Sequence, residues 1–414
     1  MHKRFTKSHT ARSVVLALTA AGSGLAFTTV HASDAGPGHN TQVSNNQDPA
    51  QVVERGVNPL AFRVPAGETT VTVSGYIKAD FFFDSENDLG DTFAASAIPT
   101  SGETNDGHFR AHARQSRLRV RSETDLGDQV LKAHLEGDFF GGGGNESFSN
   151  SASFRIRHAY FNVGKWTIGQ TWTNFMDFVA YPTTVDFFGP AGKSFARQAQ
   201  VRYTLDNGLS FSLENPEVDG NGSADRLRES TGGIGEDLLP DFVAAWRGGP
   251  GGAGGNYETA VVVRSLGVGG DIDETEGGVG INLAGAWDLG VGVVSASITT
   301  GSGIGRYIIN GAGNGLFVTE DGDLEAVDAT GLSLSYLQKW SPNSSSLIAL
   351  GAFENDDDFP ANGVDAIQTL HVNYMWNPTE ITTYGVEAIF GQNETADGES
   401  ETATRLQFGA QLNF

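Results

Sequence analysis

The sequence predicts an all-β protein that folds as a transmembrane antiparallel β-barrel of 16 strands with an inward-folded third loop. Three observations support this fold class. Runs of about 9–14 residues alternate between apolar and polar side chains from residue 70 onward. Short and long connections between these runs follow one another in turn, and the last run ends on the aromatic residue Phe414. Such runs and loops are the sequence signature of outer-membrane barrels.

The segment before the alternating runs divides into two parts. Residues 1–32 are typical of a cleaved secretory signal peptide, because a basic start leads into the mostly apolar stretch 14–30. That stretch is short for a membrane helix, which needs about 20 residues. Residues 33–69 contain four prolines and little periodicity, which predicts a flexible periplasmic linker. We therefore expect the barrel domain to span residues 70–414.

The first and last runs show the alternation clearly. In "TVTVSGYIKADFFF", Ile77 and Phe81 alternate with Lys78 and Asp80. The closing run "TRLQFGAQLNF" has the same pattern and ends on Phe414. If the apolar face meets lipid, this terminal aromatic resembles the C-terminal assembly signal of outer-membrane proteins, which the barrel-assembly machinery reads. A secreted β-sandwich or β-solenoid is the main alternative, since it alternates in the same way around an internal core.

The connections fall into two length classes. The short ones are at 125–128, 164–165, 206–208, 289–290, 341–345 and 377–379. The long ones are at about 84–107, 141–150, 175–193, 218–239, 267–277, 302–327, 355–364 and 392–401. This asymmetry predicts tight hairpins at one end of the barrel and elaborated loops at the other.

The composition excludes several functions. There is no cysteine, so neither a disulfide nor a thiolate metal site can form. The formal charge is −24, and removing the four basic residues of the signal segment leaves −28, which does not suit nucleic-acid binding. The glycine-rich "GSGIG" lacks the lysine of a phosphate loop. The acidic "DID", "DGD" and "DDD" stretches are expected to be solvated loops, with surface cations bridging lipopolysaccharide as the alternative. We expect no cofactor and no resident metal.

The most informative stretch is "HFRAHARQSRLRVRS" (108–122). Its basic residues form two alternating triplets, which are Arg110, His112 and Arg114, then Arg117, Arg119 and Arg121. A slip of one residue turns every following side chain to the other face, so we place a β-bulge near Gln115–Ser116 that keeps both triplets on one face. Arginine facing lipid near the midplane costs about 2–4 kcal/mol. This face must therefore line the lumen.

Neighbouring strands extend this basic wall. They contribute Lys132, Arg155, Arg157, Arg197 and Arg202, and the acids Glu136 and Asp138 share the face of Lys132. The opposite parity of Arg197 and Arg202 means that one faces away or that another bulge intervenes. Residues 108–202 hold 12 Lys and Arg against 8 Asp and Glu, a net +4, whereas the rest of the mature chain holds 10 against 42, a net −32. Local pairing with acids, in a purely structural role, is the alternative for these arginines.

The third long connection differs from the others. Its sequence, "FMDFVAYPTTVDFFGPAGK" (175–193), is apolar and aromatic rather than acidic. Such a surface does not suit open water, so we expect the loop to fold into the lumen and narrow it. Asp177 and Asp186 are then expected to face the basic wall. Rows of charge at a narrow opening select permeants by their sign.

Three stretches carry a family resemblance: "ARQSRLRVRSETDLGDQVLKAHLEGDFFG", "FRIRHAYFNVGKWTIGQTWTNFMD" and "TTVDFFGPAGKSFARQAQVRYTL". Together they resemble the DcaP-like porins of Gram-negative bacteria. The resemblance implies a homotrimer of 16-stranded barrels in outer-membrane lipid, a third-loop constriction, and preference for small anionic solutes such as dicarboxylates. The residues at matching motif positions are Arg114, Arg117, Arg155, Arg157, Arg197, Arg202, Asp177 and Asp186. The N-terminal coiled coil of some members is not predicted here, because residues 33–69 show no heptads.

Two other functions stay open at this point. In a secreted β-rich hydrolase, Glu136 and Asp138 would be a carboxylate pair, and such pairs work at about 5–9.5 Å. Residues two apart on one strand, however, share a wall rather than flank a substrate, so the sequence does not predict an enzyme. A structural, adhesin-like barrel without a transport role is the second alternative. Heat-modifiable migration on a gel separates the barrels from the hydrolase, and single-channel conductance separates a channel from an adhesin.

Overall fold

The computed structural model describes residues 54–55, 62–66, 69–102, 107–142, 147–217, 234–236, 238–249, 256–269, 273–309, 315–318, 324–355 and 363–414. The expected signal peptide and most of the expected linker lie outside the described residues. So do the "DGD" and "DDD" stretches and part of "DID".

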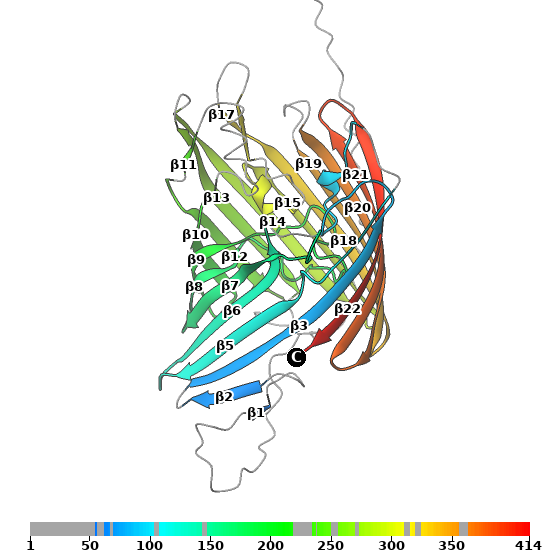
Figure 1. Ribbon diagram of the computed structural model, residues 1–414. Coiled ribbons are helices and arrows are strands. Elements are labelled where there is room, and N and C mark those ends of the chain that lie inside the picture. Colours follow the sequence, from blue (N-terminus) through cyan, green and yellow to red (C-terminus); the bar gives the residue numbers. More distant parts are fainter. Residues whose placement is uncertain are drawn as a thin grey trace, which may run out of the picture.

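The chain forms a closed antiparallel barrel of 16 strands, which confirms the predicted fold class and strand count (Figure 1). Each strand pairs with the next, and the last pairs with the first, with Phe408 opposite Phe81. Closure of the last strand on the first removes the two open edges that a flat sheet would expose to hydrocarbon. The strands are β3 (Thr69–Asp84), β4 (His108–His112) continued by β5 (Arg117–Asp125), β6 (Val130–Gly141), β7 (Ser153–Val163), β8 (Trp166–Trp172), β9 (Arg197–Thr204), β10 (Leu209–Glu214), β12 (Asp241–Gly248), β13 (Tyr257–Gly269), β14 (Glu274–Asp288), β15 (Gly292–Ser302), β18 (Asp328–Ser341), β19 (Ser344–Asn355), β20 (Val364–Thr379), β21 (Thr382–Thr395) and β22 (Ser400–Asn413).

Alternation divides the side chains between the two faces of the wall. On β3, Ile77 and Phe81 are 57% and 43% exposed, whereas Lys78 and Asp80 are 7% and 1% exposed. The last strand repeats the pattern, with Leu406 62% exposed. The apolar face therefore points outward and the polar face inward, as in a membrane barrel. The sandwich and solenoid alternatives, which bury the apolar face, do not fit this wall.

The predicted β-bulge is confirmed by the strand register. His112 lies opposite Asp80 and Arg117 lies opposite Tyr76. Four steps along β3 (from 76 to 80) thus match five steps along the neighbouring strand (from 112 to 117). The extra residue lies in a turn between β4 and β5. It restores the parity, so both arginine triplets point into the lumen.

Two short strands occur where the sequence predicted only a linker. β1 (Glu54–Arg55) pairs with β2 (Phe62–Ala66), and β2 pairs with the start of β3. The pairing of β22 with β3 reaches only as far as Tyr76, so β2 takes the backbone groups of Thr69–Val73 that β22 leaves. These two strands are thus regular structure within the segment that we expect to be a flexible linker. The pairing also moves the first barrel residue from 70 to 69.

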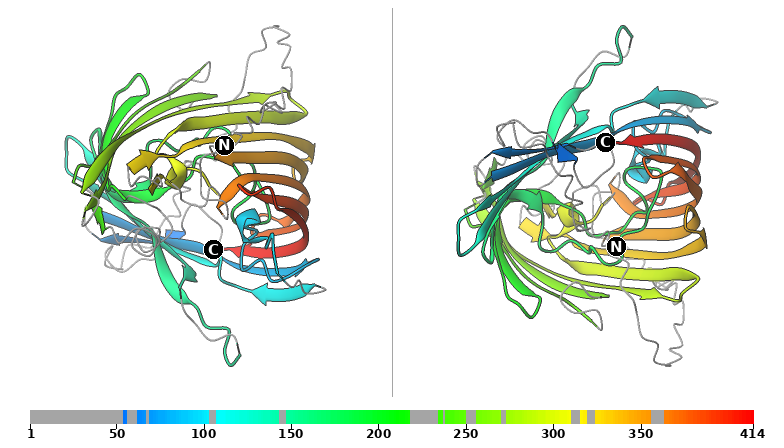
Figure 2. Two further views of the ribbon diagram at one scale, coloured as in Figure 1. Left: turned by 90° about the horizontal axis from the view of Figure 1, so that it is seen from above. Right: turned by 90° about the horizontal axis from the view of Figure 1, so that it is seen from below.

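Three long loops fold into the barrel, as the end-on views in Figure 2 show. We call residues 85–102 L1, residues 173–196 L3, and the described residues 303–309, 315–318 and 324–327 L6. L1 contains the 3-10 helix η2 (Ala95–Ala97), and L6 contains η3 (Gly305–Tyr307) with β16 (Leu316–Val318) and β17 (Leu324–Ala326). Another loop strand, β11 (Ile234–Glu236), pairs with β13. The inward fold of L3 was predicted, whereas that of L1 and L6 was not.

The inward loops share an apolar core with one side of the wall. Buried side chains of L1, L3 and L6 pack with inner-face residues of β12, β13 and β18–β22. The members include Phe93, Phe175, Ile304, Tyr307, Val243, Val262, Phe353, Ile367 and Ile389. This side of the lumen is filled, and the basic strands β4–β9 form the side opposite.

No helix in the described part of the chain has the length and apolar character needed to cross a membrane.

The last residue closes the barrel seam, and this predicts its role in assembly. Phe414 exchanges two backbone hydrogen bonds with Gly75, at 3.0 and 2.8 Å. Deleting Phe414 removes both bonds, each worth about 0.5–1.5 kcal/mol. We expect a smaller fraction of heat-modifiable barrel on a gel, with export of the chain unchanged. The Phe414→Tyr variant keeps the ring and the backbone and should assemble normally. A normal yield of the deletion variant would contradict the prediction.

Candidate functional site

The centre of the basic wall is an ion-pair cluster around Glu136. The carboxylate of Glu136 is 2.7 Å from Arg119, 2.9 Å from Arg157 and 3.4 Å from Arg117. Glu136 and Arg157 are each 3% exposed, whereas Arg119 is 24% exposed in its side chain. One buried carboxylate therefore neutralises only part of the charge of three guanidinium groups.

A second carboxylate, Asp138, continues the cluster toward the long-loop end. Arg155 binds it through two hydrogen bonds of 3.0 and 2.9 Å, and Arg157 bridges to it at 3.0 Å. Bidentate pairs of this kind fix the guanidinium plane. The ring of Phe187 in L3 lies 5.7 Å from Arg155 and 5.3 Å from Arg157. L3 thus presents an aromatic surface to the basic wall.

The first basic triplet, which is Arg110, His112 and Arg114, binds L1 instead. Arg110 forms ion pairs with Asp88 and, at 2.8 Å, with Asp91. Arg114 also binds Asp91. These contacts hold L1 against β4, and they support the structural alternative for these two arginines.

The remaining predicted cations lie on the lumen side as well. Arg202 donates to the carbonyl of Trp172 at 2.5 Å and to Gln200 at 2.8 Å. Arg197 lies 4.9 Å above the ring of Trp172, which Arg157 also contacts at 5.5 Å. The register of β9 with β8 is continuous, so no second bulge explains their parity. Arg197 is instead the first residue of β9, where L3 joins the wall.

These two arginines differ from the clustered ones in their charge balance. Among the described residues, neither Arg197 nor Arg202 has a carboxylate within ion-pair distance. Lys132 forms an exposed pair with Glu123 at 3.3 Å. Arg121 lies opposite His134 on the same inner face. Arg197 and Arg202 therefore add positive charge to the wall without a carboxylate in direct contact among the described residues.

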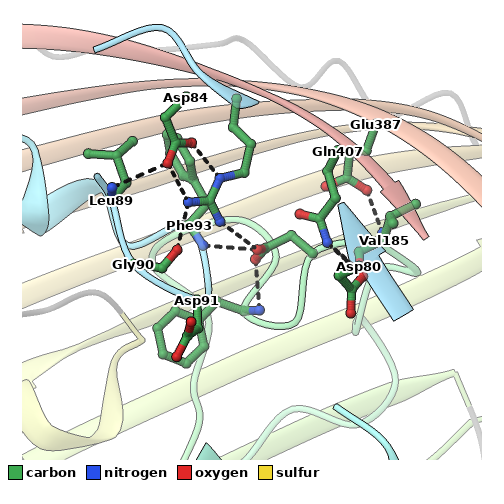
Figure 3. Close-up of polar contacts among 12 residues, drawn as sticks. Asp80, Asp84, Leu89, Gly90, Asp91, Phe93, Val185, Glu387 and Gln407 are labelled. Carbon is green, nitrogen blue, oxygen red and sulfur yellow. Dashed lines mark hydrogen bonds and ion pairs between the residues drawn. The ribbon is translucent and has the colours of Figure 1, made fainter. Parts of the chain in front are cut away.

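The tip of L3 is fixed by polar groups of the opposite wall. The backbone N–H of Val185 donates to Glu387, and its carbonyl accepts from Lys78 Nζ at 2.7 Å. Glu387 also binds His371 Nδ1 at 2.7 Å and Asn373 Nδ2 at 3.1 Å. Figure 3 shows Val185 beside Glu387, with Gln407 bound to Asp80 nearby. Sequence reasoning missed this clamp, because the clamp residues are scattered over β3, β20 and β21.

Glycines let L3 approach the backbone of the wall. A Cβ on Gly351 would lie 2.5 Å from Ala191 N, and one on Gly331 would lie 2.2 Å from Gly192 O. Gly192 itself has a φ of +79° and lies directly over the backbone of β18 and β19. Glycine inside a strand often marks such a close approach. These strand glycines were the available sequence signal for the docking surface.

L1 is tied to the barrel seam by residues that the sequence analysis did not single out. Arg405 binds Asp84 with two hydrogen bonds of 2.6 and 2.9 Å, and it donates to the carbonyl of Gly90 at 2.8 Å. Asp84 also accepts from the N–H of Leu89 at 3.2 Å. Figure 3 shows the Leu89 N–H bound to Asp84, with Gly90 of L1 nearby. Arg405 and Asp84 are fully buried, so the pair serves loop attachment.

The two acids of L3 do not face the basic wall, which corrects the expectation from the sequence. Asp186 accepts from the N–H groups of Phe93, Phe188 and Gly189 at 2.9, 2.8 and 3.1 Å. It therefore shapes the turn of L3 and joins it to L1. Asp177 is fully buried next to Ser297, on the far side of the lumen. A local turn sets the position of Asp186, and a contact with the far wall sets that of Asp177. The alternation along a strand predicts neither of these contacts.

L6 is held by a third charged cluster. Asp241 binds Arg264 at 3.1 Å and accepts from the hydroxyl of Tyr307 at 2.6 Å. Arg264 also donates to the carbonyl of Gly303. The backbone of L6 in turn bonds to L3, with Phe195 N donating to Tyr307 O at 2.8 Å. The three inward loops therefore form one connected unit.

A closed barrel with an apolar outer face, a charged lumen and an inward third loop defines the class of outer-membrane porins. The sequence profile of the family described as DcaP outer membrane protein matches residues 57–219. This match confirms, over that part of the chain, the resemblance found in the sequence. A comparison with curated proteins gave no match.

Several solved structures share the fold. The outer membrane channel DcaP of Acinetobacter baumannii is similar, with a TM-score of 0.72, 23% identity, and coverage of 84% of this chain and 97% of that one. An anion-selective porin from Comamonas acidovorans gives a TM-score of 0.51 at 13% identity, covering 84% of this chain and 100% of that one. OmpT of Vibrio cholerae in its trimer form gives 0.50 at 12% identity, covering 84% and 100%.

The clamp on Val185 predicts how L3 is released. Replacing Glu387 with leucine removes the acceptor of the Val185 N–H, and hydrogen bonds to charged groups are worth about 1.5–3 kcal/mol each. We expect higher and noisier single-channel conductance, because the tip of L3 detaches from β21. The Glu387→Gln variant keeps an acceptor oxygen, so its conductance should lie between those of the wild type and Glu387→Leu. The exposed turn residue Glu380 gives the matched control, Glu380→Leu. Wild-type conductance in Glu387→Leu would show that the clamp does not set the loop position.

Proposed function

We propose that the protein is a diffusion channel that prefers small anionic solutes such as dicarboxylates. The observation that carries this proposal is the excess of cations on the inner face of β5–β9. The arginines of the two central clusters are Arg117, Arg119, Arg155 and Arg157, against the carboxylates Glu136 and Asp138. Arg197 and Arg202 add two more charges without a carboxylate partner among the described residues.

The accessibility of these groups supports the same function. The side chain of Arg155 is 33% exposed and that of Arg119 is 24% exposed, so the charged face reaches water. The opposing loop contributes aromatic rings and no carboxylate at this point. A solute passing along the wall therefore meets net positive charge. Charged rows of this kind select permeants by sign.

The hydrolase alternative gains no support from the carboxylate pair. Glu136 and Asp138 are each held in ion pairs with arginines, and both are buried. Their roles are those of counter-ions within the wall. We keep the channel as the function that the geometry favours.

Assembly and biogenesis complete the proposal. We expect residues 1–32 to be cleaved as a signal peptide and the barrel-assembly machinery to insert the chain among outer-membrane lipid and lipopolysaccharide. We also expect a homotrimer, an expectation that comes from the family resemblance. Native mass spectrometry of the protein in mild detergent tests the trimer, and a single-chain mass would contradict it.

Reversing the charge of Arg197 tests the anion preference. Arg197 lacks a carboxylate partner among the described residues, so Arg197→Glu breaks no ion pair there. A unit charge about 5 Å from an ion contributes roughly 0.8 kcal/mol in water. A change of two charges, screened by salt over about 8 Å, leaves about 1 kcal/mol, or about fivefold in relative anion preference. We expect reversal potentials in a salt gradient to shift toward cations.

The control for this experiment carries the same charge change outside the lumen. Lys165 lies in a turn at the short-connection end, paired with Asp206 at 2.7 Å. The Lys165→Glu variant should leave the reversal potential unchanged. Equal behaviour of the two variants would show that bulk charge, rather than the wall, sets the selectivity.

A further inference from the structure

Asp177 is a buried carboxyl group with no hydrogen-bond partner. It lies in L3 and is fully buried, and neither oxygen has a hydrogen bond. The loop backbone around it is fixed, because Phe178 N donates to Glu258 at 2.9 Å and the carbonyl of Met176 accepts from Arg247 at 3.2 Å. Asp177 therefore cannot turn toward water without undocking this part of L3.

The wall opposite Asp177 offers a matching set of unsatisfied atoms. Its neighbours are Asn282 on β14 and Ser297 on β15. The amide nitrogen of Asn282 donates to Thr299 at 2.7 Å, which leaves its Oδ1 without a donor. The hydroxyl of Ser297 also has no partner. The carboxyl group of Asp177 is thus buried beside polar side chains of the wall, with no cation paired to it.

Protonation of Asp177 removes the charge from this buried carboxyl group. An ionised carboxylate only accepts hydrogen bonds, whereas a neutral acid has one O–H donor. A neutral Asp177 carries no charge in this closed site, and it can accept a hydrogen bond from the neighbouring hydroxyl of Ser297. Burial of an unpaired charge would be costly in the same place.

We propose that Asp177 is a positioning residue that docks L3 in its neutral form, and that ionisation of its buried carboxyl group weakens this docking. The inference rests on the proposed channel function for its consequence, which is a constriction whose position depends on pH. Asp177 itself touches no permeant in this arrangement.

The groups around Asp177 shift its pKa in opposite directions. Burial raises the pKa of Asp177 to about 7, and the negative charge of Glu258 on β13 raises it as well. Ser297, Lys193 and Asn282 lower the pKa by smaller amounts. Glu258 is itself paired with Arg247 of β12.

The sign of the pH effect follows from linkage. In undocked L3 the carboxyl group is in water and has a pKa of about 3.9, whereas docking raises the pKa to about 7. The docked state is fully favoured below about pH 4, and this advantage is lost as the pH rises to about 7. Within this window the ratio of docked to undocked loop falls by up to about tenfold for each pH unit. Above about pH 7 there is no further change from this group.

The direct test is a titration of the carboxyl group by infrared difference spectroscopy. The full-length protein and its Asp177→Asn variant are compared from pH 4 to pH 9. We expect a protonated-carboxyl band, present in the wild type and absent from the variant, that disappears with a midpoint near pH 7. Other buried acids cancel in the difference. A wild-type spectrum without this band would overturn the proposal, whether or not the protein conducts ions.

Single-channel noise then tests the consequence for L3. The wild type should become noisier from pH 5 to pH 8, because the loop undocks more often. Asp177→Asn mimics the neutral acid and should stay quiet over the whole range, whereas Asp177→Ala should be noisy at every pH. A purely structural role would give both variants the same noise. If Asp177→Asn retains the wild-type pH dependence, the proton is not on Asp177. A protein that conducts no ions would refute the channel function and leave the infrared result to decide the inference.

Discussion

The hydrocarbon around the barrel is the constraint on which the rest of the structure depends. It forces every backbone polar group into the closed ladder and every charged side chain of the wall to the inner face. The lumen therefore collects arginines and carboxylates that would be dispersed over the surface of a soluble protein. Within this space the charges partly neutralise each other, as Glu136 does for three arginines. The excess of arginines over Glu136 and Asp138, together with Arg197 and Arg202, gives the lumen its positive side.

The same constraint explains why the inner face of the barrel has an arginine-rich side and a side on which the loops pack. Opposite the arginines, the wall carries small, polar or apolar residues, and L1, L3 and L6 pack on them. Acids on this side bind loop backbone, as Glu387 binds Val185 and Asp186 binds Phe93. On this side the acids thus serve to attach the loops, whereas Arg119 and Arg155 of the opposite side stay partly exposed in the lumen. The sequence analysis expected acids of L3 to oppose the arginines, and an aromatic ring, Phe187, has that position instead.

The sequence predicted the strands of the barrel wall far better than the loops that fold inside it. Alternation reports which face a side chain takes, so the strand count, the bulge between β4 and β5 and the lumen position of the arginines followed from it. Loop docking depends on contacts between residues such as Val185 and Glu387, which are 202 positions apart. No local pattern encodes such a contact. The inward turn of L1 was missed because its sequence is mixed, and its anchor, the Arg405–Asp84 pair, joins the two ends of the barrel domain.

Loop position and wall electrostatics are physically coupled in this lumen. Phe187 is in contact with Arg155 and Arg157, and cation–π contacts of this kind are worth about 0.5–2 kcal/mol. If the tip of L3 leaves Lys78 and Glu387, the two arginines lose an aromatic partner and gain water. Their charge is then better screened by solvent and salt. A wider opening should therefore also be a less selective one, because the same movement that enlarges the path weakens the field along it.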